Sequence, residues 1–453
     1  MENAQEAKFK VMTESPVKPL VCRLAAPTIV SMLVTSFYNM ADTFFVGQID
    51  TSASAAVGVV FSLMAVIQAV GFFFGHGSGN YISRALGRHE TEDAERMAAV
   101  GFFSALGGGS VIMVFGLLFL RPLARWLGST ETILPYAVSY MRLILIGAPY
   151  MTASLVLNNQ LRFQGNAFYS MIGLVSGAVL NIALDPLLIF VFDMGIAGAA
   201  LATILSQFVS FVLLWIGVQR SGSLSIRAKN FRPTKTLYLQ ILNGGTPSLL
   251  RQGLGSVATI CLNVAAGVYG DAAIAGMSIV TRIMQFANSC LIGFGQGFQP
   301  VCGFNYGAKK YGRVKEAFWF CVLSSTGFLV ALAVVGYIFA APIVTVFRDD
   351  AKVIEVGVAA LRMQCLTFPL AAWIVMCNMM SQTIGKAFRA SFLAMARQGL
   401  FFVPAVLILP KLLGLTGVEI SQTAADLISF AFSIPLQASL LKEMTREERF
   451  WKN

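Results

Sequence analysis

Four polar residues in the first half of the chain could together bind a cation. Asp42, Asn181, Asp185 and Thr203 interrupt stretches that are otherwise almost wholly apolar, such as LNIALDPLLIF at residues 180–190. An aspartate inside a membrane costs about 2.5–3.5 kcal/mol on insertion scales, so its presence there predicts a function. Because burial disfavours the charged form of a carboxyl group, such a side chain could exchange H⁺, or exchange H⁺ for Na⁺.

The spacing of these residues allows one common pocket. Asn181 and Asp185 are four residues apart, so they share one face of a helix. At about 1.5 Å per residue, Asp42 lies a few residues from the outer end of its helix, and Asp185 about two turns from the outer end of its own. Thr203 lies about two turns below the start of the next helix. We therefore expect H⁺ or Na⁺ to bind there, with Na⁺ held by Asp42, Asn181 and Asp185.

Each of these residues also has a purely structural interpretation. Asp42 could reach the outer membrane interface, and Asp185 could satisfy backbone groups freed by the kink at Pro186. Asn181 could be an amide that packs one helix on another. Thr203 could bond to the backbone of its own helix.

The elements that carry these residues are predicted to be membrane-spanning helices. The chain is 56% hydrophobic and 12% charged, whereas soluble domains carry about 25% charged residues. The apolar runs are too long and too uniformly apolar for the alternating strands of a barrel. We predict an all-α integral membrane protein with twelve transmembrane helices near residues 20–46, 54–79, 94–120, 134–163, 167–192, 195–219, 237–269, 272–300, 315–341, 353–384, 388–410 and 416–441.

The basic residues indicate the orientation of these helices. The N-terminus, the connections after even-numbered helices and the C-terminus together carry 23 of the 33 Lys and Arg residues, and the opposite connections carry 5. The positive-inside rule therefore places both termini in the cytoplasm of a multi-pass cell-membrane protein. The net charge of +11 is explained by this topology, and no nucleic-acid partner is expected. The polar first nineteen residues are predicted to be neither a span nor a cleaved signal peptide.

The two halves of the chain repeat with a shift of 220 residues. Pro27 aligns with Pro247 and Asn158 with Asn378. Each repeat holds six helices, so the two bundles should be related by a pseudo-twofold axis along the membrane normal, with a substrate path between them. We expect a monomer with an N-terminal bundle, a cytoplasmic linker and a C-terminal bundle at residues 1–219, 220–236 and 237–453.

The candidate cation ligands lie where the repeat fails. Asp42 aligns with Leu262, Asn181 with Phe401 and Asp185 with Ala405. Carboxylates that only held the fold together should have counterparts in the second half. The asymmetry therefore favours a function confined to the first bundle.

The sequence resembles the MATE (multidrug and toxic compound extrusion) transporters, and most closely their DNA-damage-inducible prokaryotic branch. The resemblance rests on LAAPTIVSMLVTSFYNMADTFFVGQ, GNYISRALGR, LNIALDPLLIF and GIAGAALATILSQ. It implies two six-helix bundles around a V-shaped cavity and export of drugs or toxic organic compounds. The family's cation site falls on Asp42, Asn158, Asn181, Asp185 and Thr203. Asn158 counts deeper than the others and has its twin in Asn378, so a shared packing role stays open. The carboxylates that another branch places in helices 7 and 10 are missing.

Further polar residues could line the substrate cavity. Tyr38 and Asn39 lie one turn before Asp42 on its helix. On the other bundle the candidates are Gln285, Asn288 and Gln296. Simple packing is the alternative for all five.

These features favour a secondary antiporter that exports organic, often cationic, compounds in exchange for H⁺ or Na⁺ by alternating access. The alternative is a flippase for lipid-linked precursors, which Arg251, Arg282 and Arg397 in the second bundle would suit. A passive channel fits the repeat less well. The sequence lacks a GxxxxGK[ST] motif, an HExxH pair and a nucleophile–base constellation. We therefore expect no enzyme activity and no cofactor, with small organic compounds and the lipid bilayer as the partners.

Overall fold

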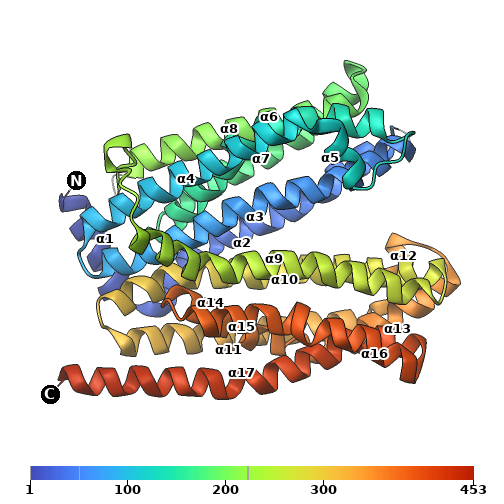
Figure 1. Ribbon diagram of the computed structural model, residues 1–453. Coiled ribbons are helices and arrows are strands. Elements are labelled where there is room, and N and C mark those ends of the chain that lie inside the picture. Colours follow the sequence, from blue (N-terminus) through green and yellow to red (C-terminus); the bar gives the residue numbers. More distant parts are fainter. Residues whose placement is uncertain (1, 50, 222–223, 453) are drawn as a thin grey trace.

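Long helices that run in roughly the same direction build most of the described structure (Figure 1). The computed structural model describes residues 2–49, 51–221 and 224–452. Among these, ten helices are long and apolar enough to cross a membrane, or eleven if the bent pair α13 and α14 is one span. The polar residues of α10 leave it outside that group, although it is 37 residues long. With α10 the twelve predicted spans are complete, which confirms the predicted fold class.

The first six spans form one bundle, which we call the N-lobe. Its helices are apolar over most of their surface, as expected for segments that face lipid or other helices. A short helix, α5 (Leu120–Trp126), follows the third span. The spans are α2 (Val17–Gly47), α3 (Thr51–Gly87), α4 (Thr91–Leu118), α6 (Leu134–Phe163), α7 (Ala167–Pro186) with the π-helical turn η1 (Leu187–Val191), and α8 (Gly195–Ser221).

The remaining spans form the C-lobe. A short helix, α12 (Ala340–Phe347), follows its third span. The fourth span breaks before Pro369 into two helices that meet at 57°, because proline cannot donate a backbone hydrogen bond inside a helix. The spans are α9 (Lys235–Gly267), α10 (Asp271–Gly307), α11 (Tyr311–Ile338), α13 (Ala351–Thr367) with α14 (Leu370–Thr383), α15 (Ala387–Met395) with the π-helical turn η3 (Ala396–Leu400) and α16 (Phe402–Leu413), and α17 (Leu415–Lys452).

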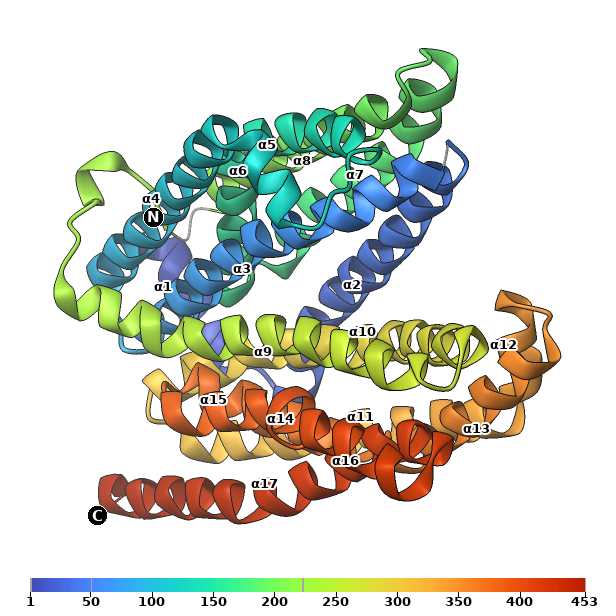
Figure 2. The ribbon, with the colours of Figure 1, turned by 45° about the vertical axis from the view of Figure 1, so that its right-hand side comes forward.

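The two lobes share a core at one end of the molecule only. At the end that carries both termini, Leu24 and Ile82 of the N-lobe belong to the same buried cluster as Leu291 and Phe298 of the C-lobe. Toward the opposite end each lobe has a separate core. In Figure 2 the ribbons of α2 and α10 move apart toward the end of the molecule that is opposite the termini. The lobes are therefore joined near the termini and part toward the far end.

Close backbone contacts hold the joined end together. The Thr28 hydroxyl on α2 donates to the Gly293 carbonyl on α10 at 2.6 Å. Arg162 on α6 is 1% exposed and donates to the Gln299 side chain on α10 at 3.1 Å. Gly293 and Gly297 let the backbone of α10 lie directly against that of α2, as small residues do between membrane helices.

A helix that was not predicted lies at the joined end. The polar N-terminal segment forms α1 (Glu2–Glu14). The Lys8 ammonium donates to the Gly165 carbonyl of the N-lobe at 2.8 Å. The Asn305 amide of the C-lobe donates to the Met12 carbonyl at 3.0 Å. The segment therefore bridges the lobes, although it is not a span.

The connection between the lobes runs from the end of α8 to the start of α9. It includes a short 3₁₀ turn, η2 (Ala228–Asn230). Glu95 on α4 holds it by accepting bonds from the Ser225 hydroxyl at 2.9 Å and the Asn230 amide at 3.2 Å. Residues 222 and 223 of the predicted linker lie outside the described residues, and the linker bounds of 220–236 stay a prediction.

Candidate cation and substrate site

Asn181 joins Asp185 to Thr203 across α7 and α8. With its amide turned so that both ends are satisfied, Asn181 donates to Asp185 Oδ2 at 3.0 Å and accepts from the Thr203 backbone N–H at 3.2 Å. Asp185 is fully buried, and the other two are each 1% exposed. The helical spacing of four residues has therefore placed an amide and a carboxylate on the face of α7 that meets α8.

Asp42 approaches this group from α2. Asp42 is half-buried and acts electrostatically on Asp185. The Oδ1 atoms of both carboxylates are buried and have no hydrogen-bond partner among the described residues. Buried polar atoms are nearly always paired, so an unpaired one calls for an explanation. Two such oxygens in one lobe are suited to accept a proton or to bind a small cation.

Two tyrosines complete the group around Thr203. The side chains of Tyr38 on α2 and Tyr140 on α6 both interact with the side chain of Thr203. The negative charges of Asp42 and Asp185 act electrostatically on both tyrosines. We call these six residues the N-lobe polar cluster: Tyr38, Asp42, Tyr140, Asn181, Asp185 and Thr203. Thr203 also donates to the Ala199 carbonyl at 3.0 Å, so its structural interpretation applies alongside its place in the cluster.

A local break in α7 follows directly behind Asp185. Pro186 ends the regular helix, and the next five residues form the π-helical turn η1. π-bulges are rare and are frequent at functional sites. The cluster therefore lies beside a backbone segment with an irregular hydrogen-bond pattern.

The structure does not bring Asn158 to this cluster. Its Oδ1 accepts a hydrogen bond from the Ser170 hydroxyl. Ser170 precedes Asn181 on α7 by eleven residues, or about 16 Å. In the other lobe, the Asn378 amide donates to the Ala390 carbonyl at 2.7 Å, and those two residues are the repeat partners of Asn158 and Ser170. The shared packing role explains Asn158 better than the cation site that the resemblance implied.

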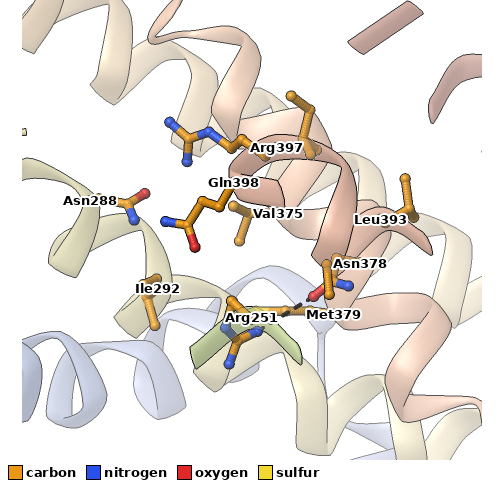
Figure 3. Close-up of a pocket in the computed structure, with 11 residues that line it drawn as sticks. Arg251, Asn288, Ile292, Val375, Asn378, Met379, Leu393, Arg397 and Gln398 are labelled. Atoms are coloured by element: carbon orange, nitrogen blue, oxygen red, sulfur yellow. Dashed lines mark hydrogen bonds between the residues drawn. The ribbon is translucent and has the colours of Figure 1, made fainter. Parts of the chain in front are cut away.

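The predicted cavity residues fall in different places. Tyr38 belongs to the N-lobe polar cluster, while its neighbour Asn39 is exposed. On α10, Gln285 is exposed and Gln296 is 9% exposed, with its amide nitrogen 4.0 Å from the Met32 sulfur of α2. Asn288 lines a pocket of the C-lobe (Figure 3). Of the five candidates, Tyr38 belongs to the N-lobe polar cluster and Asn288 lines this pocket, and the assignment of all five to a substrate cavity stays a prediction.

Two features of the site region were not predicted. Nothing marks Tyr140 in the sequence, because an aromatic residue in an apolar helix is ordinary. A buried ion pair was also overlooked: Arg397 of η3 donates to Asp426 of α17 at 2.8 Å, and Asp426 is 2% exposed. Asp426 lies within the predicted span at 416–441, so its carboxylate in an apolar helix was the signal that the sequence offered.

The family comparison reproduces the internal repeat. The model of a family described as MatE matches residues 27–187 and again residues 247–407. The two segments are offset by 220 residues (247 − 27), which is the shift predicted from the sequence.

Individual relatives cover nearly the whole chain. The multidrug export protein MepA of Staphylococcus haemolyticus (strain JCSC1435) is 28% identical over 434 residues, covering 95% of this chain and 96% of that protein. MepA of Staphylococcus aureus (strain MRSA252) is 27% identical over 416 residues, covering 91% and 92%.

Solved structures give the same result. A crystal structure of MATE in complex with MaL6 superposes with a TM-score of 0.91 at 26% identity, covering 97% of this chain and 99% of that one. An outward-facing multidrug resistance MATE transporter of the MOP superfamily superposes with a TM-score of 0.89 at 26% identity, covering 97% and 98%. The paired matches and the near-complete coverage show that this chain belongs to the MatE family and is a MATE transporter, not an enzyme.

Proposed function

We propose that this transporter exports organic compounds, drugs among them, from the cell in exchange for inward-moving H⁺ or Na⁺. One observation carries the proposal: the N-lobe polar cluster holds two carboxylates whose Oδ1 atoms are buried and have no hydrogen-bond partner in the part of the chain that the structure describes. Multidrug export in the names of the relatives supports the cargo, and the buried carboxylates support the coupling.

The lobe arrangement supports an outward-open state. With both termini in the cytoplasm, as the basic residues predict, the shared core lies on the cytoplasmic side and the separate cores on the outer side. One of the similar structures is described as outward-facing. The N-lobe polar cluster would then receive its cation from outside.

The coupling step follows from the geometry of the cluster. One H⁺ or Na⁺ between Asp42 and Asp185 neutralises one of their two negative charges, and the Asn181 bridge to Thr203 holds Asp185 in place. H⁺ would bind a free carboxylate oxygen, whereas Na⁺ would be held by oxygens of Asp42, Asn181 and Asp185. Because Asp42 lies on α2, which packs against α10, neutralisation changes the balance of forces on a helix that contacts both lobes. A cation drives transport only if it binds the two orientations of the lobes with different affinity.

Transport by purified protein in liposomes tests the proposal. A cationic dye is supplied on the cytoplasmic face, and a pH gradient or a Na⁺ gradient is imposed separately. We expect one of the two gradients to drive the dye against its own concentration difference, and a protonophore or a Na⁺ ionophore to abolish that movement. Dye movement that only ever follows its own gradient would contradict the proposal.

The flippase alternative depends on three arginines, which differ in exposure and in ion pairing. Arg282 is exposed, and Arg397 is paired with Asp426. Neither Arg251 nor Arg282 has a carboxylate within 4.0 Å among the described residues, and of these two only Arg251 lines the C-lobe pocket. One unpaired arginine in that pocket is better explained as part of a cargo site in an exporter than as a strongly cationic central cavity.

A further inference from the structure

A pocket in the C-lobe gathers polar side chains that the coupling site does not use. Its polar lining comprises Arg251 on α9, Asn288 on α10, Asn378 on α14, and Arg397 and Gln398 in η3. Figure 3 shows the amides of Gln398 and Asn288 pointing toward each other, with Arg397 on one side of them and Arg251 on the other. Ile292, Val375 and Leu393 supply an apolar wall.

Arg251 gives the pocket a positive charge that no carboxylate within 4.0 Å balances in the described part of the chain. The hydrogen bond described for Arg251 is a long one, 3.5 Å to Asn378 Oδ1. Arg397 is neutralised by Asp426 at 2.8 Å. Across the lobe interface, the described groups on which Arg251 acts electrostatically are His76 and Arg162. Both are basic, so they add no negative charge.

An unbalanced arginine inside a membrane protein is costly unless something pairs with it. A guanidinium presents a rigid fork of N–H donors that matches the two oxygens of a carboxylate or a phosphate. The amide groups of Asn288 and Gln398 add further donors beside it. The side-chain Oδ1 of Asn288 is buried and has no partner among the described residues, so this acceptor is free to receive a donor group of the cargo while the amide nitrogen donates. The lining can therefore bind a polar group that is not part of the chain.

The internal repeat separates this pocket from the shared scaffold. With the shift of 220, Arg251 aligns with Ser31, Arg397 with Gly177 and Gln398 with Ala178. The N-lobe thus has small or neutral residues where the C-lobe has arginines, just as the C-lobe has apolar residues where the N-lobe has carboxylates. The two lobes have opposite charge at non-equivalent positions.

We propose that the C-lobe pocket binds the oxyanion, a carboxylate or a phosphate, of an amphipathic organic cargo. Arg251 donates to the oxyanion, the amides of Asn288 and Gln398 orient it, and the apolar wall holds the adjoining hydrocarbon. The cargo class then includes carboxylated and zwitterionic compounds as well as simple cations. This inference rests on the proposed export function.

A matched pair of dyes tests the inference. Rhodamine 123 is a cationic methyl ester, and rhodamine 110 is the same dye with a free carboxyl group. Their affinities are measured by fluorescence anisotropy on the purified protein in phosphatidylcholine nanodiscs, without any gradient. We expect Arg251→Gln to lower the affinity for the free acid relative to the ester by about tenfold, the loss of one charge-assisted pair. The control Arg282→Gln, on an exposed side chain, leaves that ratio as in the wild type.

A second variant and a second lipid complete the test. Arg251→Lys keeps the charge without the fork and should lower the ratio by less than Arg251→Gln. Nanodiscs with phosphatidylglycerol distinguish the source of the oxyanion. A lipid phosphate would weaken rhodamine 110 binding to the wild type but not to Arg251→Gln, whereas a cargo carboxylate would leave the wild-type ratio unchanged.

An affinity ratio that is the same in the wild type and in both Arg251 variants overturns the inference. Because binding is measured without transport, this result is distinct from a failure of export. If the Arg251 variants change the affinity ratio as expected but the wild-type protein transports neither dye, the result counts against the export function alone.

Discussion

The contact between Gly297 and α2 gives a quantitative prediction about the joined end of the lobes. A Cβ atom added at Gly297 would lie 2.4 Å from Ala25 Cα and 2.5 Å from Ala25 N. Carbon atoms in good contact are about 3.5–4.0 Å apart. Because the obstructing atoms are backbone, no side-chain rotation relieves the overlap. Gly297→Ala therefore forces α2 and α10 apart by about 1 Å.

Overpacking of this kind costs about 1–3 kcal/mol. The penalty falls on the arrangement in which these helix ends touch, and not on one in which they have separated. The equilibrium between the two should shift toward separation by roughly 5- to 150-fold. Gly253→Ala in α9 is the matched control, because a Cβ there has no neighbour within 4 Å.

Electron spin resonance distances can measure this shift. Nitroxide labels on Glu92 of α4 and Lys442 of α17, both exposed, report the separation of the lobes at the end with the termini. In a cysteine-depleted protein, we expect Gly297→Ala to add a longer-distance population that the wild type and Gly253→Ala lack. An unchanged distance distribution in Gly297→Ala would refute the reasoning about this interface.

Two further predictions concern single side chains. Asn181→Ala removes the amide that donates to the buried Asp185 Oδ2, so the free energy of unfolding should fall by about 1–3 kcal/mol. Thermal unfolding of that variant beside Asn39→Ala, at an exposed position, checks this, and equal melting temperatures would contradict it. Burial lowers the pKa of Lys8 in α1 to about 8 from its ordinary 10.5. Undocked α1 then holds a proton between about pH 8 and 10.5 that docked α1 has lost, so docking should tighten as the pH rises through that window. A nitroxide on the exposed face of α1 should become less mobile from pH 7.5 to 9.5, and Lys8→Met should remove that change; equal pH dependence in Lys8→Met would contradict it.

The sequence predicted the spans well because membrane thickness and apolar composition determine their length. It did not predict where spans break. Pro149 and Pro369 are repeat partners, yet α6 continues through Pro149 while α13 and α14 separate at Pro369. Tertiary packing decides which outcome a proline has, and the sequence does not encode that packing locally. The helical form of α1 also escaped prediction, since its contacts come from residues in both lobes.

The candidate site was predictable where helical spacing alone decides. Asn181 and Asp185 share a face of their helix at a spacing of four residues. Thr203 was included because it lies about as deep in the membrane as Asp185. The position of Asn158 along its helix also predicted a greater depth in the membrane than that of the other four residues, in agreement with its hydrogen bond to Ser170. Tyr140 escaped, because an aromatic residue in a span has no distinguishing pattern.

Asp426 escaped for a different reason. The internal repeat points to polar residues of the N-lobe that have apolar partners in the C-lobe. Asp426 aligns with Gln207 when the shift is 219, as it is near the end of the repeat, so it is a carboxylate that the C-lobe has gained. Its pairing with Arg397 depends on the packing of η3 against α17, which only the structure reveals.

Cation-coupled export by Asp42→Asn and Asp185→Asn tests the central claim most directly. Each variant keeps the shape of the side chain and removes one charge from the N-lobe polar cluster. Asp193→Asn, at an exposed aspartate close to the cluster helices in sequence, is the control. In liposomes under the driving gradient, we predict that both cluster variants lose export by about tenfold or more, equivalent to about 1.4 kcal/mol, while Asp193→Asn exports like the wild type. Export at the wild-type rate in either cluster variant would contradict the account.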